Sequence, residues 1–96
     1  MSMRITRGQP PEGQTDELIR KWKAFWPERM RAVPGFQHAH FGIDRATGAT
    51  ATVSVFSDKP DDALMERNLR EFRDMLGRSD SGQGPEITSY EVVAEV

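Results

Sequence analysis

Apolar positions along the chain follow two different periods, which predict two helices and four strands. In residues 15–33 and again in residues 58–77 the apolar side chains recur every three or four positions, as on a helix with one buried side. Alternating, β-branched segments at residues 3–7 and 87–96 indicate strands near the two ends of the sequence. Small polar residues and glycines at 79–84 predict a loop before the last strand.

Residues 33–58 predict a β-hairpin between the two helices. The sequence Ala46-Thr47-Gly48 is typical of a three-residue hairpin loop in which Gly48 takes the left-handed conformation. The strand pairs that follow from this loop are Phe41 with Val53, Ala39 with Val55 and Ile43 with Ala51. Because side chains alternate along a strand, these apolar pairs share one face, which we expect the helices to cover.

The ends of the two helices carry the usual residue types. Thr15 is a good N-cap for the first helix, and Asp58 can cap the second, which Gly77 ends. Pro27 has no N–H to donate, so the pattern predicts a kink or restart at Trp26-Pro27.

The element order is therefore β-α-β-β-α-β. This order predicts an α+β, ferredoxin-like fold for residues 1–96 as a single domain, with a four-stranded antiparallel sheet and both helices on one face. Two layers leave the other sheet face open, and a partly apolar open face is usually covered by a second copy. We expect a homodimer packed sheet to sheet.

Composition narrows the functional classes. Charged residues make up 29% of the chain, their signs are interspersed and the formal net charge is −2, so nucleic acid is not an expected partner. No cysteine is present, which excludes disulfides and thiolate chemistry. No apolar run approaches the roughly 20 residues that span a bilayer, and no signal peptide is recognisable. We expect a cytoplasmic protein without a membrane partner.

Both histidines of the chain, His38 and His40, lie on the hairpin face opposite the apolar pairs. Neighbouring imidazoles offer a base near neutral pH or two metal ligands, and interface histidines show the same pattern. A metal would need further ligands, such as Glu91 from another strand. We expect no metal and place both histidines at the dimer interface, with a role as catalytic bases if the strand register differs.

Asn68 stands inside the apolar arc of the second helix, between Leu64 and Phe72. A buried amide without a partner costs about 1–3 kcal/mol. We therefore expect either a hydrogen bond to a strand backbone or to Tyr90, or a role facing a ligand. Arg29 lies near the apolar side of the first helix, where it either reaches the rim or binds an anion.

Aromatic residues are the candidates for a binding site. Trp22 and Trp26 lie one turn apart on the buried side of the first helix. Together with Phe41, Phe72 and Tyr90 they either fill a core or wall a flat aromatic cavity between helices and sheet.

The step Pro34-Gly35-Phe36, the hairpin after it and the step Phe56-Ser57-Asp58 into the second helix resemble the antibiotic-biosynthesis-monooxygenase-like group of dimeric α+β barrel proteins. The resemblance covers nearly the whole chain. It implies a substrate pocket between the helices and the sheet of one subunit. The group is similar to cofactor-free monooxygenases acting on polycyclic phenols, to quinol oxygenases and to haem-degrading enzymes. Its common Trp-Glu-Ser step looks like Phe56-Ser57-Asp58 here, and its histidine on the second helix has no counterpart, although Asn68 stands in that region.

These observations lead to one functional hypothesis and two alternatives. We expect a cofactor-independent monooxygenase that binds a planar aromatic or phenolic molecule, with Asn68 as the polar anchor. A non-catalytic dimer module that senses a ligand or is purely structural is the alternative. A haem-degrading oxygenase is the third option, and it would need an axial histidine on the helix-facing side of the hairpin.

Overall fold

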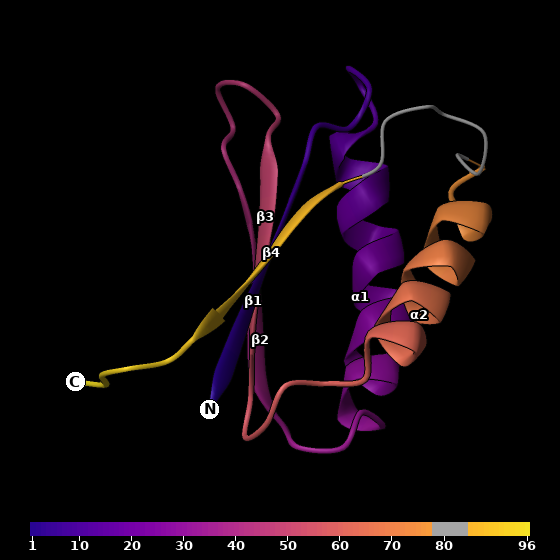
Figure 1. Ribbon diagram of the computed structural model, residues 1–96. Coiled ribbons are helices and arrows are strands. Elements are labelled where there is room, and N and C mark those ends of the chain that lie inside the picture. The colour runs from indigo at the N-terminus through magenta and orange to yellow at the C-terminus, as the bar shows by residue number, and fades with distance from the viewer. Residues whose placement is uncertain (78–84) are drawn as a thin grey trace.

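The predicted order of elements and the α+β fold are confirmed. The computed structural model describes residues 1–77 and 85–96, and the loop predicted at residues 79–84 lies outside the described residues. The elements are β1 (Ser2–Gly8), α1 (Thr15–Arg31), β2 (Phe36–Ile43), β3 (Thr50–Phe56), α2 (Asp62–Met75) and β4 (Glu86–Glu91). The strands form one antiparallel sheet in the order β2-β3-β1-β4. Both helices cover the same face of this sheet and run side by side (Figure 1).

The helices differ from the sequence prediction in three places, one inside α1 and two at N-termini. α1 continues through Pro27, so the restart predicted there is wrong, and Trp26 and Met30 on either side of the proline are both buried in the core. Its N-cap is Gln14, so Thr15 is the first residue of the helix. α2 is capped by Asp61, whose Oδ1 accepts a hydrogen bond from the backbone N–H of Ala63 at 3.0 Å.

The predicted register of the β2–β3 hairpin is wrong by one residue. The backbone N–H of Asp44 donates to the carbonyl of Ala49 at 2.8 Å, so the loop holds four residues rather than three. Gly48 takes the left-handed conformation as predicted, with φ of +79°. As a result, Phe41 pairs with Thr52 and Ala39 pairs with Ser54.

This shift exchanges the β3 side chains between the two faces of the sheet. Ala39 and Phe41 pack against the helices as predicted, but their neighbours on that face are Thr52 and Ser54 instead of valines. His38 and His40 therefore share the open face with Val55 and Val53. The face predicted for the histidines is confirmed. For β3 the prediction is reversed, because its polar side chains face the helices and its valines face away from them.

The core lies between the helices and the sheet in two adjacent clusters. One cluster contains Leu18, Trp26, Met30 and Phe72, and the second contains Val33, Phe56 and Met65. Trp22 stacks on Phe41 with ring centroids 4.8 Å apart, which fixes α1 over β2. Phe56 is fully buried and contacts the ring of Phe36 edge to face.

The last strand is shorter than predicted. β4 ends at Glu91, and the N–H of Val92 donates to the carbonyl of Met1 at 2.9 Å. Beyond that bond the chain leaves the sheet on the side away from the helices, and Val93 is 86% exposed (Figure 1). Among the described residues, no helix has the length and apolar character needed to cross a membrane.

We expect Phe56→Ala to lower the free energy of unfolding by about 3–5 kcal/mol, because it opens a cavity at a fully buried site. Urea denaturation followed by circular dichroism measures this loss. Met75→Ala is the control, since Met75 is 42% exposed and its truncation should change stability by less than about 0.5 kcal/mol. Similar losses in the two variants would contradict the core described above.

Candidate functional site

A cavity of about 190 Å³ lies between the two helices and the sheet. Large apolar side chains from both helices form its walls: Leu18, Trp22, Trp26, Met30, Met65 and Phe72. Phe41 adds a further ring from β2. Such a space, walled by aromatic and aliphatic groups and placed between layers, is typical of small-molecule sites.

The floor of the cavity is polar. It is formed by the helix-facing side chains of β1 and β3, where Thr6 pairs with Thr52 and Arg4 pairs with Ser54. The Ser54 hydroxyl donates to the carbonyl of Arg4 at 3.4 Å. Thr6 and Thr52 make no hydrogen bond through their hydroxyls to any other described residue, so both can bind a ligand.

Arg4 brings a positive charge to this floor. Its side chain is partly buried, and burial lowers the pKa of its guanidinium, while the carboxylate of Asp62 raises it by a smaller amount. Within residues 1–77 and 85–96, Arg4 has no ion-pair partner. Sequence reasoning missed Arg4, although the alternation of β1 places it on the same face as Thr6.

Four of the five aromatic residues predicted to bind a ligand meet at the cavity: Trp22, Trp26, Phe41 and Phe72. The fifth, Tyr90, is not among the residues that line the cavity. Tyr90 pairs with Met3, whose side chain points away from the helices, and it is 43% exposed on the open face of the sheet.

The histidines lie away from the cavity. The rings of His38 and His40 are 5.6 Å apart, and both side chains are exposed on the open face. The axial histidine that haem binding would need on the helix side is therefore not supplied by the hairpin. No group of three or more histidine or acidic residues in the described parts of the chain is arranged to hold a metal.

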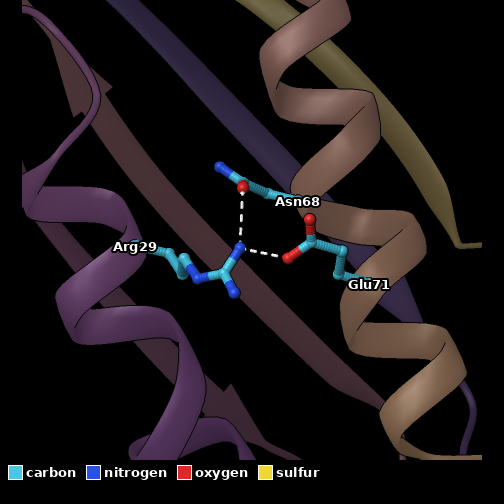
Figure 2. A network of polar contacts seen from close by, with 3 residues as sticks. All are labelled: Arg29, Asn68 and Glu71. Carbon is cyan, nitrogen blue, oxygen red and sulfur yellow. Dashed lines mark hydrogen bonds and ion pairs between the residues drawn. The ribbon is translucent and has the colours of Figure 1, made fainter.

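Asn68 joins the two helices instead of lining the cavity (Figure 2). Its side chain is buried, and its Oδ1 accepts a hydrogen bond from Nη1 of Arg29 at 3.4 Å. The same nitrogen forms an ion pair with Glu71, and the guanidinium lies 4.6 Å from the centroid of the Phe25 ring. Asn68 thus has a partner that the sequence did not suggest, and Arg29 reaches the rim, where it binds an acid of its own chain.

No residue predicted as catalytic is among the residues that line the cavity. Asn68 contacts Arg29 between the helices, and His38 and His40 face the opposite side of the sheet. Their catalytic roles stay predictions. Among the described residues, the polar side chains that line the cavity instead carry hydroxyls, the amide of Gln9 and the two guanidinium groups of Arg4 and Arg73.

The Asn68–Arg29 contact predicts measurable coupling between the two helices. In a double-mutant cycle of Asn68→Ala and Arg29→Met, we expect an interaction free energy of about 0.5–1.5 kcal/mol, measured by urea denaturation. The matched cycle combines Asn68→Ala with Arg70→Met, because Arg70 pairs with Glu66 on the exposed side of α2. That cycle should give an interaction free energy near zero. Equal interaction free energies in the two cycles would contradict a specific contact between Asn68 and Arg29.

The comparisons with known proteins concern the fold. No protein-family model and no curated protein sequence matches the chain. A candidate antibiotic biosynthesis monooxygenase from Deinococcus radiodurans has a similar structure, with a TM-score of 0.71 at 14% identity over 100% of this chain and 96% of that one.

Two further structures are similar over nearly their full length. SnoaB, a cofactor-independent oxygenase from Streptomyces nogalater solved as a point mutant, gives a TM-score of 0.67 at 13% identity, covering 99% of this chain and 95% of that one. PA3566 from Pseudomonas aeruginosa gives 0.66 at 21% identity, covering 97% and 94%. The chain therefore has the fold of the antibiotic biosynthesis monooxygenases, as its resemblance to that group predicts.

Proposed function

We propose that the protein binds a small planar aromatic molecule in the cavity between helices and sheet and oxidises it with O₂ without a cofactor. The observation that carries this proposal is the combination of aromatic walls, from Trp22, Trp26, Phe41 and Phe72, with a floor of hydroxyl groups. Flat apolar walls suit the faces of an aromatic ring, and hydroxyls suit a polar substituent on its edge. The fold it shares with a cofactor-independent oxygenase supports the choice of reaction.

The size of the cavity limits the ligand. Its volume of about 190 Å³ exceeds the roughly 150 Å³ of an engineered cavity that holds benzene, and it lies below the roughly 300–1,000 Å³ of sites for drug-sized molecules. A molecule of one or two fused rings fits this range. 1-Naphthol is a suitable probe, because it has two rings and an acidic hydroxyl.

The proposed reaction needs only a proton acceptor, O₂ and a site that excludes water. Loss of the hydroxyl proton makes 1-naphtholate, whose electron density is raised at the ring carbon para to the oxygen. Transfer of electrons to O₂ forms a carbon–oxygen bond there and gives a hydroperoxide. Loss of water then leaves 1,4-naphthoquinone, so one oxygen atom of O₂ enters the product and the other leaves as water.

One observation favours a second candidate function, a non-catalytic ligand-binding module. The described residues that line the cavity include no carboxylate and no imidazole, which are the usual general bases. A binding module and an oxygenase share the same cavity, and they differ in whether O₂ is consumed.

We also propose that the protein is a homodimer joined through the open sheet face. The centre of this face is apolar and is formed by Met3, Ile5, Val53 and Val55. Tyr90 extends it on β4, and the exposed Val93 lies in the segment that leaves the sheet on this side. In aqueous solution an apolar face of this kind is usually buried against another protein surface. An identical copy presents a matching surface.

The oxygenase proposal predicts that purified protein binds 1-naphthol and increases O₂ uptake above the uncatalysed rate. Leu69→Trp should weaken binding at least tenfold, because the larger side chain fills the cavity. Calorimetry and an oxygen electrode measure the two effects. Ala24→Trp on the exposed side of α1 is the control and should change neither. Binding without O₂ uptake would select the binding module, and equal binding by all three proteins would exclude this cavity as the site.

The dimer proposal predicts that Val53→Lys shifts the protein from dimer to monomer at micromolar concentration. A lysine at this position places an unpaired charge in the apolar face. Sedimentation velocity measures the change. Thr47→Lys in the exposed hairpin loop adds the same charge outside the face and should leave the dimer intact. A monomeric parent protein would refute the proposal.

A further inference from the structure

Within residues 1–77 and 85–96, the charged side chains that line the cavity are all of one sign. Arg4 and Arg73 are among the described residues that line it, and no aspartate or glutamate is. A cavity of this kind disfavours a cationic ligand and favours an anionic one, because the walls are apolar and screen charges poorly. This inference rests on the aromatic-binding function proposed above and narrows its substrate class.

The two arginines lie at opposite ends of the cavity. On β1, Arg4 pairs with Ser54 and Gly8 pairs with Thr50. These two positions are four residues apart, which is about 13 Å at the usual rise of a strand. Arg73 is in the last turn of α2, at the end of the helix beside that second position. Its charge is therefore partly offset by the negative end of the helix dipole, whereas Arg4 has no such compensation.

Among the described residues, no acid forms an ion pair with Arg4. Its paired neighbours on the helix-facing side of the sheet are Ser54 and Ser89, and both are neutral. Asp62 of α2 is the carboxylate that acts on it electrostatically, but that carboxylate forms its own ion pair with Lys59 at 3.5 Å. Glu91 pairs with Ser2, the next residue of β1 on the same face, and its side chain is exposed. The structure shows no ion pair between Glu91 and Arg4.

A partly buried guanidinium without an acid costs free energy, and this cost is removed when an anion binds beside it. The unbonded hydroxyls of Thr6 and Thr52 lie on the same floor and can donate to the same anion. We propose that Arg4 binds the ionised oxygen of a planar aromatic ligand, so that the protein selects phenolates and aromatic carboxylates over neutral aromatic molecules.

This role gives Arg4 a chemical consequence in the proposed reaction. A positive charge within about 4–6 Å of an acid favours the ionised form and lowers its pKa by about 1–3 units. A phenol bound beside Arg4 would thus give its proton to water and become the electron-rich anion at a lower pH than the free phenol does. No carboxylate or imidazole is then required at the cavity.

Three two-ring probes of similar shape test the proposal: 1-naphthol, 1-naphthoate and 1-methoxynaphthalene. The last cannot ionise and reports binding to the aromatic walls alone. We expect the wild-type protein to bind 1-naphthoate at least tenfold more tightly than 1-methoxynaphthalene in calorimetry. We also expect bound 1-naphthol to ionise at least about one pH unit lower than free 1-naphthol, as seen in its ultraviolet absorption.

Substitutions at the two arginines assign the effect to one end of the cavity. Arg4→Gln should abolish the preference for 1-naphthoate and the early ionisation of 1-naphthol, and leave binding of 1-methoxynaphthalene within twofold. Arg4→Lys keeps the charge and should restore most of the preference. Arg73→Gln removes the guanidinium at the other end of the cavity lining and should weaken the preference less than Arg4→Gln does. Arg70→Gln removes a guanidinium from the exposed side of α2 and is the matched control, which should retain the preference.

The outcomes separate this proposal from the function on which it rests. If none of the three probes binds, the aromatic-binding function itself is wrong. If 1-methoxynaphthalene binds as well as 1-naphthoate, the cavity is aromatic and the role of Arg4 is wrong. Equal weakening of all three probes by Arg4→Gln also overturns it, because Arg4 would then act only on the structure.

Discussion

The four-residue loop between β2 and β3 determines the chemical character of both sheet faces. Asp44 and Ala49 close this loop by a backbone hydrogen bond, and a left-handed Gly48 completes it. Because side chains alternate along a strand, one residue more or less in the loop would exchange every side chain of β3 between the two faces. The loop directs Thr52 and Ser54 towards the helices and the intervening valines away from them. β3 is also the central partner of β1, so the same register brings Arg4 opposite Ser54.

The polar floor explains why a cavity exists at all. Serine and threonine side chains are short, whereas the helices above them present tryptophans, methionines and phenylalanines whose reach is limited by their packing against one another. Short side chains below and wide ones above leave space between the layers. The hydroxyls of Thr50 and Ser54 are tolerated there because they donate to backbone carbonyls of β1. The apolar side chains that would have filled the space lie on the other face of the sheet, which is the face of the proposed dimer contact.

Local patterns in the sequence were enough to predict the elements and the direction in which several aromatic and histidine side chains point. Helical periodicity identified Trp22, Trp26 and Phe72 as inward-facing, and strand alternation placed His38 and His40 opposite Phe41, because each of these properties depends on a few neighbouring residues. The register was missed because it depends on how many residues the loop contains, and Ala46-Thr47-Gly48 fits a three-residue loop as well as the end of a four-residue one. Tyr90 was placed wrongly for a related reason, since its face follows from pairing with β1, more than 80 positions away in sequence.

Asn68 and Arg4 show how polar residues facing a core divide into structural and ligand-binding groups. The sequence drew attention to Asn68, because an amide in an apolar arc needs a partner. The structure supplies that partner within the chain, from Arg29 on the neighbouring helix, and this contact accounts for the burial of the amide. Arg4 drew no attention, because an arginine in an alternating strand is ordinary. Yet its charge faces the cavity, its serine neighbours are neutral, and Asp62 is held by Lys59. The burial of Asn68 is explained by the fold alone, and that of Arg4 is better explained by an anion from outside the chain.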